Sequence, residues 1–235
     1  MTYYSRIEQS FCAVTRTKSL PTIRITIFAN KQTFRSGFTW VSDCYDGVMT
    51  REISRHYQDP LEIIWLNVAR QCGIRVVRDS EVFASWDGQG VLRIGTTETL
   101  DPDDSLAQMI LHELCHALVA GPDSFSEEDW GLVYDDQSHQ VFEHAALRLQ
   151  AALADEVGMR EFFASTTDFR NYFDALPDDA LSCDHEDRAA ELATQAMQQL
   201  RSGEWYAPIR DGLNRTKAIA DLIADANVEK SIWNL

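Results

Sequence analysis

The sequence predicts an α+β fold, with a small N-terminal mixed sheet packed on a mainly helical C-terminal half that contains a buried motif helix. Short β-branched or alternating segments lie before residue 100, whereas helical periodicity dominates from residue 101 onward. No internal repeat or low-complexity linker interrupts the 235 residues. We therefore expect one domain over residues 1–235, made of a strand-containing half, 1–100, and a helical half, 101–235.

Alternating β-branched residues and turn residues locate the elements expected in the strand-containing half. The clearest is a hairpin, because Asp87-Gly88-Gln89-Gly90 separates two apolar runs. The hairpin places an edge strand beside the following helix, and this edge could bind an extended peptide by β-augmentation or be capped by a loop. The expected elements are a helix at 7–14, a strand at 22–28, a helix at 61–71 ended by Gly73, a strand at 74–77, and hairpin strands at 82–86 and 91–95.

Capping residues delimit the helices expected after residue 100. The first of these, the motif helix, is expected to begin with Asp101 as N-cap and Pro102 in its first turn, and to end at Gly121. An acidic loop over 121–137 follows it. Further helices are expected at 138–156, 159–164, 168–175, 183–201 and 214–226, with a turn at 177–179.

Charge and composition limit the classes of partner. A formal net charge of −16 argues against nucleic acid or an anionic membrane, because both attract basic surfaces. The chain has no apolar stretch long enough for a membrane span, and its N-terminus lacks the pattern of a signal peptide. The five cysteines include no C-x-x-C pair, which favours reduced thiols in the cytoplasm. A second metal site built from Cys12, Cys44 and Cys183 is the alternative interpretation.

Residues 111–116, Leu-His-Glu-Leu-Cys-His, contain the H-E-x-x-H pattern. Residues four apart lie on the same side of a helix, so the two imidazoles can bind one metal ion. The glutamate between them would lie beside the metal as a general base. We therefore expect a Zn²⁺ cofactor, with His112 and His116 as ligands and Glu113 as the catalytic residue.

The helix that carries this pattern is apolar almost all round, which is typical of a buried helix. Ionisable side chains are costly to bury unless they are paired or bind a metal. Zinc would offset that cost for the two imidazoles, and a water molecule on the zinc would give Glu113 a partner. The alternative is a chance match to the pattern, in which hydrogen bonds in the core satisfy all three side chains.

A catalytic zinc site usually has three protein ligands and one open position. The metzincin pattern is excluded as the source of the third ligand, because the chain continues Ala117-Leu118-Val119-Ala120-Gly121 after the motif. We expect Glu143 to be the third ligand, because it lies at the edge of the apolar face of the next long helix. Ala145 and Ala146 would let that helix approach the motif helix closely.

Other candidates for the third ligand remain open. His139 lies one turn before Glu143 and would be its partner or the ligand itself. Glu186 is a rival, although a carboxylate in the first turn of a helix also complements the helix dipole. His144 is expected to point to the far side of its helix and to face solvent.

The motif His112-Glu113-x-x-His116, followed by Glu143 on the next long helix, resembles the zincin metallopeptidases of the gluzincin kind over roughly residues 90–150. It looks like a bacterial group with an H-E-L-C-H motif. The resemblance implies that His112, His116 and Glu143 bind zinc and that Glu113 activates the water on the metal. In such a mechanism Glu113 passes the proton to the leaving amine, and Tyr134 or His139 would help to stabilise the oxyanion.

The expected function is that of a zinc-dependent peptidase acting on a peptide or protein substrate. One alternative is a non-catalytic zinc-binding or interaction protein, in which His139 joins the three other ligands and closes the site. The other is a metallohydrolase that acts on a non-peptide amide. Binding of a hydroxamate would distinguish an open site from a closed one, and a substrate panel with and without chelator would distinguish the two enzymes.

Overall fold

The computed structural model describes residues 54–132, 140–166, 169–182, 187–226 and 229–233. The chain divides into two units, Met1–His56 and Tyr57–Leu235. The described helices and strands all belong to the second unit. The helix expected at 7–14 and the strand expected at 22–28 lie outside the described residues, so they stay predictions, as does the single domain over 1–235.

A three-stranded mixed sheet follows the first described helix. The central strand pairs in parallel with one neighbour and antiparallel with the other, in the order β1-β3-β2. Leu92 and Ile94 are fully buried and alternate with the exposed Arg93, so one face of the sheet packs on the core. The expected hairpin is therefore confirmed. The strands are β1 (Arg75–Arg78), β2 (Ala84–Trp86) and β3 (Val91–Ile94).

Helices form most of the remaining fold, and the α+β class predicted from the sequence is confirmed. In the described part of the chain the α-helices are α1 (Pro60–Gln71), α2 (Leu106–Ala120), α3 (Gln140–Asp155), α4 (Arg170–Asp174), α5 (Arg188–Ser202) and α6 (Tyr206–Ile223). Short 3-10 segments are η1 (Pro122–Ser126), η2 (Glu128–Gly131) and η3 (Ala224–Ala226).

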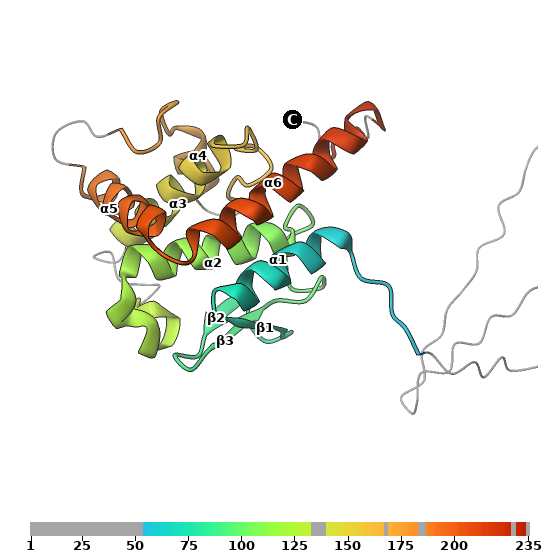
Figure 1. The fold of residues 1–235 in the computed structure, drawn as a ribbon, viewed down its shortest axis with the longest axis horizontal. Helices are drawn as coiled ribbons and strands as arrows, with labels where there is room; N and C mark the ends of the chain where they lie inside the picture. The colour runs from blue at the N-terminus through green and yellow to red at the C-terminus, as the bar shows by residue number, and fades with distance from the viewer. Residues whose placement is uncertain (1–53, 133–139, 167–168, 183–186, 227–228, 234–235) are drawn as a thin grey trace, which may run out of the picture. The chain divides into compact units, whose positions relative to one another are not determined.

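Helix α2 lies at the centre of the helical layers (Figure 1). It contacts α1, α3 and α5, while α1 also contacts the sheet through β1 and the last helix, α6. Most of the side chains of α2 are buried on every side, so the expected buried motif helix is confirmed. The motif residues therefore lie on a helix inside the core rather than on a surface loop.

The start of α2 differs from the prediction. The helix begins at Leu106 with Ser105 as its N-cap, rather than at Asp101 and Pro102. Ser105 Oγ accepts a hydrogen bond from the Gln108 backbone N–H at 3.2 Å, and Gln108 Oε1 accepts one from the Ser105 N–H at 2.8 Å. These reciprocal bonds form a capping box, which satisfies two backbone donors together and thereby sets the start of the helix.

Two later helices also begin elsewhere than expected. Asp187 caps α5 by accepting hydrogen bonds from two backbone N–H groups, so this helix begins at Arg188 and not near Cys183. Helix α6 begins at Tyr206, before the predicted Asn214, because Pro208 is tolerated in a first helical turn. Gly212 then lets α6 approach α1, since a Cβ atom there would lie 2.7 Å from the Val68 side chain.

The segment 159–164 is a turn rather than the expected helix. A single helix-like bond, from the Phe163 N–H to the Met159 carbonyl at 3.1 Å, is too short a nucleus for a regular helix. Met159, Phe162 and Phe163 are fully buried, so apolar burial holds the turn in place. The turn presents its backbone carbonyls to α2 and α3, which matters for the site described below.

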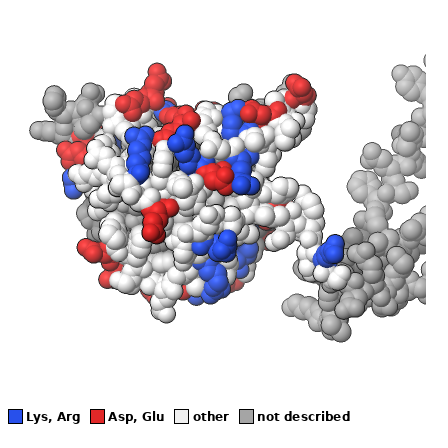
Figure 2. Space-filling view, in the orientation of Figure 1, with Lys and Arg blue, Asp and Glu red and all other residues white. Residues whose placement is uncertain are grey.

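Acidic and basic side chains are interspersed on the face of the molecule shown in Figure 2. Along α6, for example, Arg215 pairs with Asp211 and Lys217 with Asp221, each at i,i+4 spacing. The net charge of −16 therefore does not form one uninterrupted acidic field on this face. No helix in the described part of the chain is long and apolar enough to cross a bilayer.

The capping box predicts a measurable contribution to stability. Ser105→Ala removes the acceptor for the Gln108 N–H and should lower the free energy of unfolding by about 1 kcal/mol. Urea denaturation followed by circular dichroism measures this change. Asp101→Ala is the matched control, and a loss at Asp101 as large as that at Ser105 would contradict the observed cap.

Candidate metal centre

Helix α2 brings the imidazoles of His112 and His116 together on one of its faces. Their positions are one turn apart, and the rings meet edge to face with centroids 4.5 Å apart. The two Nε2 atoms are 3.0 Å apart. Both rings thus direct their Nε2 atoms to one point, which is the arrangement needed to bind one common ion.

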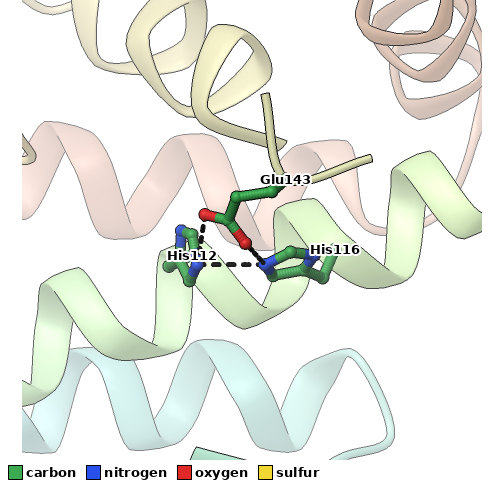
Figure 3. A group of neighbouring side chains, drawn as sticks. All are labelled: His112, His116 and Glu143. Carbon is green, nitrogen blue, oxygen red and sulfur yellow. Dashed lines mark hydrogen bonds and ion pairs between the residues drawn. The ribbon is translucent and has the colours of Figure 1, made fainter. Parts of the chain in front are cut away.

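Helix α3 brings the carboxylate of Glu143 to the same point (Figure 3). Glu143 Oε2 lies 3.0 Å from His116 Nε2, and its Oε1 lies 3.5 Å from His112 Nε2. Fully buried Ala145 and Ala146 follow on α3, which packs directly on α2. Small side chains at this helix contact account for the reach of Glu143 to both rings.

These three side chains fit a tetrahedral metal ion. Ligand atoms bound to zinc at 2.0–2.1 Å lie about 3.3 Å from one another in tetrahedral geometry. The three separations among His112, His116 and Glu143 are 3.0, 3.0 and 3.5 Å, which lie on both sides of that value. Two imidazole nitrogens and one carboxylate are also the donor set typical of a catalytic zinc site. The group can therefore hold zinc with little rearrangement.

The electrostatics of the group favour an added positive charge. Burial alone would raise the pKa of Glu143, but the His112 charge and the His116 hydrogen bond outweigh it and lower this pKa to about 2. Burial alone would likewise lower the pKa of His116, yet the hydrogen bond and negative charge of Glu143 raise it. The carboxylate thus stays ionised and attracts a cation to the imidazoles.

Gln150 orients the His112 ring. Its Oε1 atom lies 2.9 Å from His112 Nδ1, while its Nε2 donates a hydrogen bond to the Phe163 carbonyl at 2.5 Å. The bond to Phe163 sets which end of the amide faces the histidine. Because Oε1 can only accept, Nδ1 of His112 carries the proton, and in the neutral ring Nε2 then has a lone pair that could bind a metal. The turn at 159–164 therefore acts on the site through Gln150.

The motif glutamate, Glu113, is buried on α2 and has its own partner, but it does not belong to the group of converging ligand atoms. Trp130 donates a hydrogen bond from Nε1 to Glu113 Oε2 at 3.1 Å. The negative charge of Glu113 contributes to the raised pKa of His116, so the carboxylate acts on the same group of side chains. The Nδ1 atom of His116, in contrast, is buried and has no hydrogen-bond partner among the described residues.

The loop after α2 places Trp130 and also covers part of the sheet edge. Asp129 Oδ1 accepts a hydrogen bond from the Trp86 backbone N–H at 2.9 Å, on the edge strand β2. The Trp130 ring stacks on the Trp86 ring at 4.3 Å. Of the two roles expected for this edge, capping by a loop is therefore observed at Trp86.

A small pocket of about 50 Å³ opens beside the candidate metal group, which consists of His112, His116 and Glu143. His112, Glu143 and Gln150 line it together with apolar, hydroxyl, amide and carboxyl side chains. His112 and Glu143 keep about a fifth of their side-chain surface exposed, so a small ligand can reach them. The remaining lining residues are Phe83, Asp104, Gln108, Met109, Ala164, Ser165 and Thr166.

The structure brings together the three residues predicted as ligands, His112, His116 and Glu143. His139 and Glu186, the alternatives for the third ligand, lie outside the described residues. Tyr134 and the cysteine group Cys12, Cys44 and Cys183 do so as well. Their roles stay predictions.

The expectation that His144 faces solvent is wrong. Its ring is half-buried and stacks on the ring of Tyr172 with centroids 3.7 Å apart. The far side of α3 is covered by the segment that includes α4, and Arg148 also binds Tyr172 there. A helix wheel shows which residues of α3 share a face, but it does not show that another segment of the chain packs against the face that carries His144.

Sequence reasoning missed Gln150 and Trp130 as members of the site. Gln150 lies seven residues, two helical turns, after Glu143, so its place on the ligand face was readable from the spacing. Trp130 carried no such signal, because it comes from an irregular loop.

Comparisons with protein-family models, curated proteins and solved structures found no significant match for the chain.

The contact between Gln150 and His112 predicts an effect on metal affinity. Gln150→Leu removes the acceptor that fixes the His112 ring and should weaken zinc binding about 10- to 100-fold. Competition with a chromophoric chelator measures the dissociation constant. Gln108→Leu is the matched control, because Gln108 donates to the neighbouring Ala164 carbonyl but contacts no imidazole. Equal losses in the two variants would contradict an orienting role for Gln150.

Proposed function

We propose that the protein is a zinc-dependent hydrolase, a peptidase of the zincin type that resembles the gluzincins. The observation that carries the proposal is the convergence of His112 Nε2, His116 Nε2 and the Glu143 carboxylate, which lie within 4.8 Å of one another. Three protein ligands beside an open pocket suit a catalytic site better than a closed structural one.

Each residue of the group has a defined task in this proposal. His112, His116 and Glu143 hold the zinc ion, and Gln150 keeps the His112 ring in the tautomer that can bind it. Zinc held there would lower the pKa of a coordinated water and polarise the carbonyl of the scissile bond. The pocket beside His112 would hold a small part of the substrate.

Glu113 is the general base of the proposed reaction. Its carboxylate takes a proton from the attacking water and then passes it to the nitrogen of the leaving amine. The buried position of Glu113 suits this task, because its partner Trp130 leaves the second carboxylate oxygen available to the water. The peptide or protein substrate is proposed on the resemblance to zincins, and a non-peptide amide would undergo the same chemistry.

A cytoplasmic location is part of the proposal. The described cysteines Cys72 and Cys115 are both free and buried. Burial raises the pKa of both thiols, that of Cys72 to about 12, so neither is a reactive thiolate. Free thiols of this kind fit a reducing compartment.

The proposed role of Glu113 predicts a separation of zinc binding from turnover. Glu113→Gln should retain zinc and lower kcat at least 100-fold, because it removes the base but none of the three ligands. Elemental analysis measures the zinc, and a fluorogenic peptide library measures the rate. Glu128→Gln, which changes a glutamate on the exposed part of the following loop, is the control. Full activity in Glu113→Gln would refute the assignment.

The three ligands predict that zinc stabilises the folded protein. At a free zinc concentration 1,000 times the Kd, binding should contribute about 4 kcal/mol and raise Tm by roughly 8–16 °C. Differential scanning calorimetry of the chelated and zinc-loaded protein measures the shift. His116→Ala and Glu143→Ala should each remove most of it, whereas His144→Ala should not. An equal shift in all three variants would contradict the proposed ligand set.

An inhibitor tests whether the site is open. A hydroxamate should compete with substrate and bind only to the zinc-loaded protein, because it needs a free position on the metal. Isothermal titration calorimetry measures this binding with and without zinc. Zinc-loaded protein that binds no hydroxamate and cleaves nothing would indicate a closed, non-catalytic site instead.

A further inference from the structure

We propose that Trp130 is a positioning residue that holds the Glu113 carboxylate in one orientation beside His112, His116 and Glu143. The catalytic meaning of this orientation rests on the proposed function, but the orientation itself can be measured without turnover. Trp130 comes from η2, outside both helices that carry the metal group. The inference therefore adds a third element to the site.

The contact between Trp130 and Glu113 is buried at both ends. Trp130 is 4% exposed and Glu113 is 9% exposed, and their Nε1 and Oε2 atoms are 3.1 Å apart. An indole nitrogen can only donate and an ionised carboxylate can only accept, so the polarity of this bond is unambiguous. With little water to compete, a charge-assisted hydrogen bond restricts the carboxylate strongly.

Aromatic packing fixes the indole that makes this bond. The rings of Trp130 and Trp86 stack at 4.3 Å with an interplanar angle of 9°, and Phe125 packs edge-on to Trp130 at 5.9 Å. Trp86 Nε1 donates to the Phe125 carbonyl at 3.0 Å, and the Phe125 ring stacks in turn on Trp205. The indole of Trp130 is thus held from two sides and cannot rotate away from Glu113 without unstacking.

The backbone of η2 adopts unusual dihedral angles that place the Trp130 indole against Glu113. Asp129 and Trp130 have φ angles of +46° and +59°, in the left-handed region that residues other than glycine rarely adopt. Such residues persist only where surrounding contacts determine them. Here Asp129 Oδ1 binds the Trp86 backbone N–H, while the next residue presents its indole to Glu113. One of these two residues therefore contacts the edge strand β2 and the other contacts the motif helix α2, so η2 links the two elements.

The hydrogen bond from Trp130 makes the two carboxylate oxygens of Glu113 different from each other. The bond occupies Oε2, so Oε1 is the oxygen that remains for a proton donor. Without the indole, the flexible glutamate side chain would sample other rotamers around its three side-chain torsions. A general base loses efficiency when its geometry is loosened, even when its chemical identity is unchanged. Trp130 thus acts on the reaction only through Glu113.

Nuclear magnetic resonance tests the contact without any substrate. The six tryptophans give six indole N–H signals, which single Trp→Phe variants assign. In the full-length protein, Glu113→Ala should move the Trp130 indole signal upfield and leave the Trp65 signal in place. Trp65 is a matched internal control, because its buried indole donates to Thr216 Oγ1 at 2.9 Å instead. A Trp130 signal that does not respond to Glu113→Ala overturns the inference.

Kinetics test the effect of the orientation. Trp130→Phe keeps an aromatic ring but removes the donor, and it should lower kcat roughly 10- to 100-fold with little change in KM or zinc content. Trp65→Phe should leave kcat within about twofold, since it keeps the ring and removes an indole donor that binds Thr216 rather than Glu113. A loss in Trp65→Phe as large as that in Trp130→Phe would show a general effect of packing and overturn the inference.

The outcomes separate this inference from the proposed function. A rise in kcat in Trp130→Phe would mean that the indole restrains Glu113 away from the reaction, which also overturns it. If the zinc-loaded wild type cleaves no substrate, the proposed function fails while the indole signal still decides whether Trp130 holds Glu113. If Trp130→Phe does not fold, the comparison of wild type with Glu113→Ala gives the same decision.

Discussion

The close packing of α2 against α3 is the constraint on which the candidate site depends. His112 and His116 lie on a buried helix, so a third ligand must come from an element that touches the same face. Ala145 and Ala146 keep the contact thin enough for Glu143 to reach both rings. On the other side of α3, Arg148 binds Asp187 at the start of α5 through a partly buried ion pair.

Burying ionisable groups has a free-energy cost, and the surrounding segments supply the partners that offset it. The turn at 159–164 fixes Gln150, which binds His112, while η2 supplies the indole for Glu113. Gln150 lies on α3, but the Phe163 carbonyl that fixes it and the indole of Trp130 come from irregular segments, whose shape depends on buried aromatic side chains rather than on backbone periodicity. The aromatic residues of the core therefore serve two purposes, since they stabilise the fold and aim the polar groups.

Periodicity and spacing were sufficient to predict the elements that carry the site, but not the contacts between them. The hairpin, the buried motif helix and the ligand face of α3 follow from local patterns in the sequence. The start of α2 was misjudged because Ser105 and Gln108 bind each other reciprocally, which outweighs a good isolated cap at Asp101. Trp130 could not be predicted, because its position depends on two left-handed residues and on a ring far away in the sequence.

A count of protons at the centre shows how a cation would suit these side chains. When the proton of a neutral His112 ring is held on Nδ1 by Gln150, its Nε2 is an acceptor, as are both oxygens of Glu143. An N–H on His116 Nε2 then faces two acceptors, His112 Nε2 and Glu143 Oε2, each at 3.0 Å, and Glu143 Oε1 lies 3.5 Å from His112 Nε2. A second proton or a metal ion would compensate the remaining lone pairs. A divalent cation would do so for all three groups at once, whereas an extra proton would leave His112 Nε2 and the carboxylate to share it across 3.5 Å.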